Sequence, residues 1–355
     1  MARSSSGQPL VVGLLAHRGL AGAVAAPLAI CIAVDRKTIR LGDIERALLL
    51  LAWATGLVYV LANHLLDPQH FASAGLAFVS EEGIFKFDTS FIAFGFFYYA
   101  FIGVRKGSPQ GYILSLPFLG YLVFEFQGRS LLLALLVSFV VLSYAWKLRT
   151  NPFRYPLWLA CGALLAWAAV SQLTPRFYAD LVERFGAAFT VVVDSEMTGD
   201  PSANARMIEA ALVLPSVDEW WLAGTGVVSN QWDGSHEAVA GSYFYAADIG
   251  VLGVVYLYGV LGLVAFGVQF VLAAGWSRSR RGRGLPGTAL IDACNGFLLF
   301  SAIRSLATGQ FAFNPEVGFM LLAVLWCAQR EGGVCPVSQG LATAQGLSRQ
   351  AGEHG

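Results

Sequence analysis

The sequence predicts an all-α integral membrane protein, a polytopic bundle of about nine transmembrane helices with one long helical external loop. Hydrophobic residues make up 56% of the 355-residue chain and charged residues only 13%. The mean hydropathy is +0.60, and these values together lie outside the range of soluble globular proteins. The apolar residues form continuous runs instead of alternating with polar ones, which argues against an outer-membrane β-barrel. A disordered chain and a disulfide-stapled secreted domain are excluded by the same composition.

Nine apolar stretches approach the length of about 20 residues that a transmembrane helix needs. They cover residues 9–34, 47–66, 89–104, 111–126, 130–146, 155–172, 243–273, 287–306 and 313–328. The first contains His17 and Arg18, so a full span, an interfacial helix and a cleaved signal peptide all stay open for it. The predicted organisation is therefore six helices in residues 1–172, a loop over 173–242, three helices in 243–328 and a flexible tail over 329–355.

Basic residues gather in alternate loops, and this pattern sets the predicted orientation. Most Lys and Arg residues fall in segments 35–46, 105–110, 147–154 and 275–285 and in the tail. Such a bias is typical of cytoplasmic loops. The intervening loops, 67–88 and 173–242, are acidic and are predicted to face outward.

The segment 173–242 is too long for a simple turn between spans, and loops of this length are usually functional or disordered. Residues 204–214 follow an amphipathic helical pattern, which favours order. Trp220 and Trp221 are suited to the headgroup level of a bilayer. We expect most of this loop to be folded onto the membrane surface.

Ionisable residues in apolar spans are the candidate functional residues, because each costs roughly 2.5–3.5 kcal/mol on insertion scales. The predicted orientation places five of them near the outer leaflet: Glu125, Arg129, Asp248, Arg304 and Glu316. Asp292 lies towards the inner half of its span, where it could reach the inner headgroups. Snorkelling of such side chains to the headgroups is the structural alternative to a functional role.

Arg129, Arg206 and Arg304 are the candidate anion-binding residues. If three guanidinium groups gather at one level among apolar helices, carboxylates or a bound anion must offset their repulsion. Guanidinium groups bind phosphate oxygens in a bidentate way, which suits the pyrophosphate of a polyprenyl carrier anchored in the same leaflet.

Other chemistry has little support in the sequence. The chain has no His-Glu-x-x-His, Cys-x-x-Cys or Asp-x-Asp motif, so no metal is expected, and no cofactor-binding motif is present. The zero formal net charge gives no electrostatic case for a nucleic-acid partner. Four cysteines fall in predicted spans and Cys335 in the tail, so no disulfide is expected. Gly224 and Gly226 are predicted to form a turn, and Gly250, Gly253, Gly259 and Gly262 to allow close helix approach.

Three local patterns resemble the O-antigen polymerase and ligase superfamily. They are Gly128-Arg129-Ser130 at the start of a span, Arg206 in a helix followed by Trp residues and Gly224-Thr225-Gly226, and His236 followed by Asp248 and Gly250 to Gly253. The resemblance implies a multi-pass protein of the bacterial inner membrane whose active face is periplasmic. It also implies pyrophosphate binding by the three arginines and makes His236, Glu237 and Asp248 the candidate catalytic residues.

The leading hypothesis is a metal-independent membrane glycosyltransferase that polymerises or ligates polysaccharide repeat units. Its partners would be a polyprenyl-pyrophosphate-linked oligosaccharide donor, a glycan acceptor, membrane lipids and other polysaccharide export proteins. The main alternative is a transporter or flippase for a lipid-linked or anionic solute, which needs ionisable residues or broken helices near the midplane. A non-catalytic scaffold in an export complex is a third hypothesis.

Overall fold

The computed structural model describes residues 7–9, 11–13, 18–65, 77–79, 85–126, 129–147, 201–228, 244–282 and 288–331. Within these residues helices account for almost all regular structure. The helices of the first half are α3 (Arg18–Asp35), α4 (Leu41–His64), α6 (Ser90–Lys106), α7 (Pro109–Gly120), the π-helix η1 (Tyr121–Phe126) and α8 (Arg129–Lys147). Those of the second half are α11 (Pro201–Trp220), the 3₁₀ helix η2 (Ala246–Ile249), α13 (Gly250–Gly282), α14 (Ala289–Thr308), α15 (Gln310–Phe313) and α16 (Glu316–Glu331).

One feature departs from the predicted all-α class. Strands β1 (Ala77–Val79) and β2 (Phe85–Phe87) form an antiparallel pair within the predicted external loop 67–88. Phe87 packs in the protein, where its ring stacks on Tyr59 of α4 at 4.2 Å. The short sheet therefore follows α4 and leads directly into α6.

Four described helices are long and apolar enough to cross a membrane. They are Arg18–Asp35, Leu41–His64, Ala246–Ser277 and Ala289–Thr308, and residues 130–143 form a shorter apolar helix. The first predicted span thus contains the apolar helix Arg18–Asp35. The predicted sixth span, residues 155–172, and the tail lie outside the described residues, and the count of nine stays a prediction.

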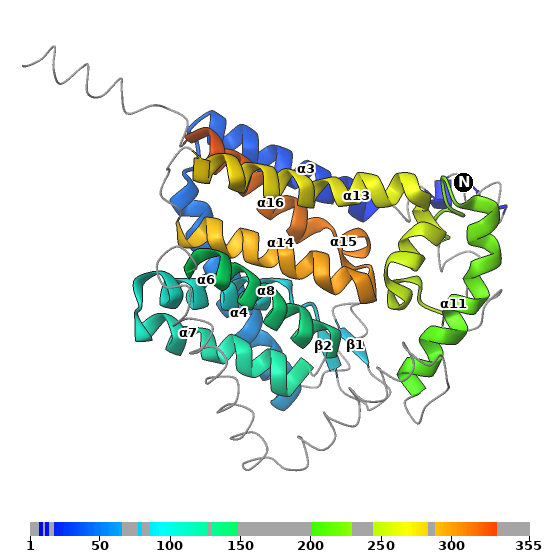
Figure 1. Cartoon of the computed structure of the whole chain (residues 1–355), viewed down its shortest axis with the longest axis horizontal. Helices are drawn as coiled ribbons and strands as arrows, with labels where there is room; N and C mark the ends of the chain where they lie inside the picture. Colours follow the sequence, from blue (N-terminus) through cyan, green and yellow to red (C-terminus); the bar gives the residue numbers. More distant parts are fainter. Residues whose placement is uncertain are drawn as a thin grey trace, which may run out of the picture.

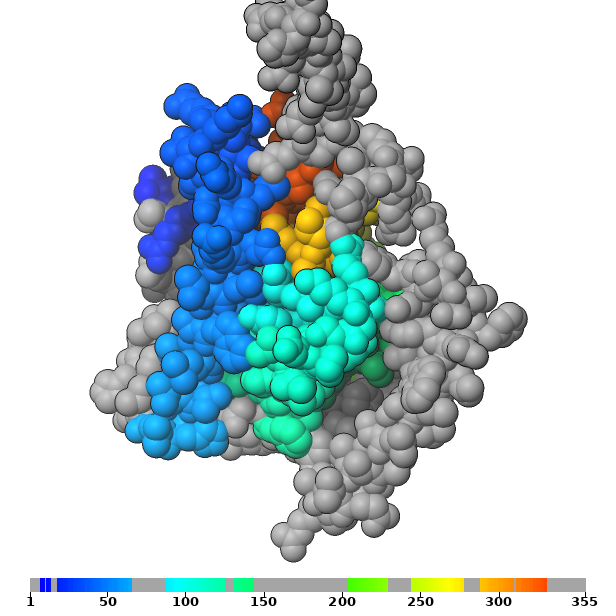
Figure 2. Space-filling view, turned by 90° about the vertical axis from the view of Figure 1, so that its left-hand side faces the viewer, coloured from blue at the N-terminus to red at the C-terminus, as the bar shows by residue number. Residues whose placement is uncertain are grey.

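The apolar surface of the bundle agrees with a membrane protein. Helices α3, α4 and α13 expose large apolar side chains, among them Leu50 and Val271, which are 71% and 72% exposed. Water would penalise so many exposed apolar groups, whereas lipid tails accept them. Figure 2 shows one such face, on which α4 lies beside α6 and α7.

The core is centred on α14, which lies among α6, α8, α13 and α16 (Figure 1). Aromatic rings of α6 pack on this helix, as in the contact of Phe97 with Phe300 at 6.0 Å between ring centroids. Gly296 makes this approach possible, because a Cβ atom there would lie 2.8 Å from the rings of Phe97 and Phe101. Most of α14 is buried in consequence.

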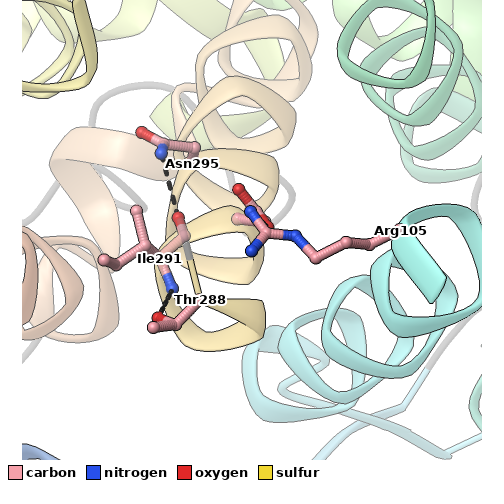
Figure 3. A network of polar contacts seen from close by, with 5 residues as sticks. Arg105, Thr288, Ile291 and Asn295 are labelled. Atoms are coloured by element: carbon pink, nitrogen blue, oxygen red, sulfur yellow. Dashed lines mark hydrogen bonds and ion pairs between the residues drawn. The ribbon is translucent and has the colours of Figure 1, made fainter. Parts of the chain in front are cut away.

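Asp292, which the sequence suggested could reach the inner headgroups, is buried in an ion pair. Its Oδ2 lies 2.8 Å from Nη2 of Arg105, and its side chain is only 7% exposed. Figure 3 shows Arg105 extending from α6 to the first turns of α14, beside Thr288, Ile291 and Asn295. The carboxylate has therefore found a cation on a neighbouring helix, which offsets its desolvation.

A thiol pair joins the first and last described helices and provides a test of the fold. Sγ of Cys31 on α3 lies 3.8 Å from Sγ of Cys327 on α16. We expect copper-phenanthroline oxidation of membranes to form a disulfide between them, because their sulfur atoms are already close. The product is detected as a link between the terminal fragments after proteolysis that dithiothreitol removes.

The matched variants are Cys31→Ser, which should lose the link, and Cys294→Ser, which should keep it because the buried Cys294 lies on α14. A link that is absent from the oxidised wild-type protein, or that survives in Cys31→Ser, would contradict this helix packing.

Candidate functional site

Two of the predicted site residues, Arg206 and Asp248, belong to α11 and η2, and α11 lies beside one end of α13 (Figure 1). Helix α11 packs against η2 and the first part of α13, and η2 in turn packs on α14. The predicted amphipathic helix over 204–214 is confirmed as part of α11, which is longer at both ends. This arrangement brings the described part of the predicted external loop next to the start of the seventh predicted span.

Helix α13 is broken at Gly259, which has φ 66° and ψ −174°. The break prevents the backbone N–H groups that follow from bonding within the helix. Instead, the N–H of Val260 donates to the carbonyl of Trp221 at 2.8 Å, and that of Leu261 donates to Leu222 at 3.1 Å. The donors released by the break are therefore used by the segment that follows α11.

The carbonyl groups before the break are satisfied by the same segment. The N–H of Thr225 donates to the carbonyl of Tyr256 at 2.8 Å, and the N–H of Gly226 donates to that of Leu257 at 2.9 Å. The hydroxyl of Thr225 adds a 3.0 Å hydrogen bond to Tyr256. We call this pairing of residues 221–226 with residues 256–261 the clasp.

Glycine is needed on both sides of the clasp. Gly224 has φ 69°, and a Cβ atom there would lie 2.4 Å from the Leu257 carbonyl group. At Gly259 the corresponding atom would lie 2.3 Å from the Leu222 carbonyl group. The predicted turn at Gly224 and Gly226 and the predicted close approach at Gly259 are confirmed, although a loop and not another helix makes the approach.

Arg206 and Asp248 both lie close enough to Glu209 to act on its carboxyl group electrostatically. Oε1 of Glu209 accepts a 3.1 Å hydrogen bond from the backbone N–H of Tyr245, just before η2. Its side chain is buried, with 7% exposure. Arg206, one turn earlier on α11, and Asp248, on η2, both interact electrostatically with the Glu209 carboxyl group. A cation and two carboxyl groups therefore share one site.

The environment of Glu209 opposes ionisation. Burial is the main factor that raises the pKa of its carboxyl group, and the nearby Asp248 charge raises this pKa further. The hydrogen bond from Tyr245 and the charge of Arg206 act in the opposite direction but do not cancel the rise. Such a group can hold or release a proton in response to a nearby ligand.

Arg304 lies near the C-terminal end of α14, where α6 begins. Its Nη1 donates to the hydroxyl of Thr89 at 3.4 Å, and its guanidinium carbon lies 5.9 Å from the centre of the Phe300 ring. The carboxylate of Asp88 is close enough to interact with it electrostatically. Asp88 itself is fixed by hydrogen bonds from the backbone N–H and hydroxyl of Ser90, at 3.2 and 2.8 Å.

The structure therefore brings together some of the predicted site residues. Arg206 and Asp248 share a site, whereas Arg304 contacts the start of α6. Arg129 begins α8, but its side chain lies outside the described residues, as do His236 and Glu237. The meeting of three arginines stays a prediction.

Two acidic residues of these sites were missed by the sequence analysis. Glu209 follows Arg206 by three positions on the predicted helix, so their spacing already placed them on one face. Asp88 gave no such signal, because its contact with Arg304 joins distant parts of the chain. The sequence suggested that carboxylates or a bound anion would offset the arginine charges. In the described residues, carboxylates lie near Arg206 and Arg304.

Comparison with known proteins adds no relative. No protein-family model matches the sequence, and no curated protein matches it. The resemblance to O-antigen polymerases and ligases therefore rests on its three local patterns. Arg206, the Gly224-Thr225-Gly226 turn and Asp248, which come from two of these patterns, lie at the same end of α13 in the structure.

Substitution of Gly259 should weaken the clasp. We expect Gly259→Ala to lower stability by at least about 1–2 kcal/mol, because an L-residue is strained at positive φ and its methyl group would overlap the Leu222 backbone. Gly267→Ala is the matched control on the same helix, since nothing lies within 4 Å of its Cβ position. Thermal unfolding of both variants in detergent measures the difference, and equal midpoints would argue against the clasp.

Glu209 should make stability depend on pH. Its raised pKa means that the contribution of the protonated carboxyl group is fully present below the unfolded-state pKa and is lost as the pH rises through the folded-state pKa. We expect the unfolding midpoint of the wild-type protein to fall across that interval and Glu209→Gln to reduce the fall. Glu219→Gln, on the exposed face of α11, should keep the wild-type slope; three identical slopes would refute the assignment.

Proposed function

We propose that this protein is a membrane glycosyltransferase that polymerises or ligates saccharide units carried on a polyprenyl pyrophosphate. The observation that carries the proposal is that Arg206 and Asp248 both act electrostatically on the buried Glu209, which the N–H of Tyr245 holds beside η2. A guanidinium group recognises phosphate, and a carboxylate can accept the proton of a sugar hydroxyl. Both groups that such a transfer needs are therefore found in one place.

The reaction needs neither ATP nor a metal. The acceptor hydroxyl oxygen forms a bond to the anomeric carbon of the donor, while the bond from that carbon to the pyrophosphate oxygen breaks. The polyprenyl pyrophosphate leaves with the electron pair, and the hydroxyl proton passes to a base. The protein has to orient two lipid-anchored substrates and to stabilise the negative charge that grows on the leaving group.

In this proposal each candidate residue has a defined task. Arg206 binds the pyrophosphate, and Arg129 and Arg304 contribute positive charge at the same level. Asp248 competes with His236 and Glu237 of the external loop for the role of base. We further propose that the protein lies in the bacterial inner membrane, with this site on the periplasmic face.

A transporter or flippase for a lipid-linked or anionic solute is the second candidate. The break of α13 at Gly259 favours it, because discontinuous helices form the substrate sites of many transporters. Against it, the backbone groups released by the break pair with residues 221–226 and so are occupied. The buried Arg105–Asp292 pair is likewise neutralised internally. The transferase is therefore the better supported function.

The decisive variant is Arg206→Ala. We expect it to abolish polymer formation while insertion into the membrane persists, because the pyrophosphate loses its guanidinium partner. Purified protein is reconstituted with lipid-linked oligosaccharide, and longer products are resolved as a ladder on a gel.

The control is Arg184→Ala, in the same predicted external loop, which should be tolerated. Equal activity of the two variants would overturn the role of Arg206. Movement of the lipid-linked substrate across the bilayer without any longer product would favour the transporter.

A further inference from the structure

We infer that binding of a phosphate group at Arg206 is coupled to the uptake of one proton by Glu209. The inference rests on the proposed function, because it deepens the same site: it states how a site that contains two carboxyl groups can accept an anionic ligand. The proton comes from the solvent, and no bond of the substrate changes in this step.

The two oxygens of the Glu209 carboxyl group differ in their hydrogen bonds. Oε1 is held by the N–H of Tyr245 at 3.1 Å. Oε2 is buried, and no hydrogen-bond donor reaches it within the part of the chain that the structure describes. A buried carboxylate oxygen without a donor is unfavourable, and protonation of the carboxyl group removes the buried charge.

The charges around Glu209 explain why ligand and proton should bind together. On its own helix it faces the cation of Arg206, and on η2 the carboxylate of Asp248. Tyr245 precedes η2, and α13 has no charged residue in positions 250–277. Arg206 is thus the cation that favours ionised Glu209.

A phosphate bound to Arg206 reverses this balance. It neutralises the guanidinium charge and brings its own negative charge towards the carboxyl group, and both effects favour the protonated form. Protonation of Glu209 then removes one of the two carboxylate charges that repel the phosphate. Affinity should consequently decrease by up to about tenfold per pH unit above the pKa of the ligand-free carboxyl group.

The test is isothermal titration calorimetry of the full-length protein in detergent with farnesyl pyrophosphate. Titrations in two buffers of different ionisation enthalpy give the number of protons taken up. We compare the wild-type protein with Glu209→Gln, whose amide keeps an acceptor for Tyr245 and a donor at the other position. Protons gained by the pyrophosphate itself cancel in the difference between the two proteins.

We expect the wild-type protein to take up as much as one proton more than Glu209→Gln and to lose affinity more steeply with pH. Glu219→Gln, exposed on the same helix, should match the wild-type protein. Binding with equal proton uptake in all three proteins would overturn the inference and leave the proposed function standing. Failure of the wild-type protein to bind at any pH would overturn both.

The same pyrophosphate group occurs in a lipid carrier and in free inorganic pyrophosphate. Inorganic pyrophosphate is therefore titrated in parallel to distinguish the two ligands. Tighter binding of farnesyl pyrophosphate assigns the ligand to a lipid, and equal binding assigns it to the free anion. The difference in proton uptake between the wild-type protein and Glu209→Gln is expected with either probe, and its absence with both would contradict the coupling.

Discussion

The arrangement of the candidate site depends on backbone hydrogen bonds across the break at Gly259. Two donors and two acceptors near the break would be unsatisfied in an apolar bundle, at a cost of several kcal/mol each. Residues 221–226 satisfy all four. Because α11 ends at Trp220, directly before this segment, the clasp fixes the end of α11 to α13. The bond from Tyr245 to Glu209 adds a second attachment, so the position of Arg206 follows from both.

Helix α14 is held in register with α6 by polar contacts at both of its ends. At its beginning Asp292 pairs with Arg105 at the end of α6, and at its end Arg304 contacts Thr89 at the start of α6. Polar contacts at both ends of one helix pair restrict sliding, because any shift would break a buried charged interaction. Gly250, where α13 begins, packs on the Leu306 carbonyl near the end of α14. Contacts with α14 therefore fix the position of η2 and the start of α13, and with them the position of Glu209.

Continuous apolar runs predicted the helices well, because an apolar segment is buried as a helix whether lipid or other helices surround it. The predicted spans 89–104, 287–306 and 313–328 correspond to α6, α14 and α16 within a few residues. The break at Gly259 was not predictable, since its cause is a partner segment near Gly224 that is remote in sequence. The Arg304–Asp88 contact was missed for the same reason. Glu209 was accessible to sequence reasoning, because helical spacing from Arg206 is a local rule.

The charge balance decides how the Glu209 site can serve an anion. With both carboxyl groups ionised, Arg206 is outweighed by Asp248 and Glu209, and a pyrophosphate would be repelled. The repulsion can be offset in two ways. Either further cations, such as Arg129 and Arg304, lie near the bound anion, or one carboxyl group becomes neutral. Arg304 already has Asp88 and Thr89 beside it, so its charge is partly compensated. Glu209 is the carboxyl group whose burial already opposes ionisation, and neutralising it costs the least. In this proposal, anion binding is coupled to protonation of Glu209, so the affinity for the anion depends on pH. Anion binding by Arg129 and Arg304 alone would not produce this pH dependence.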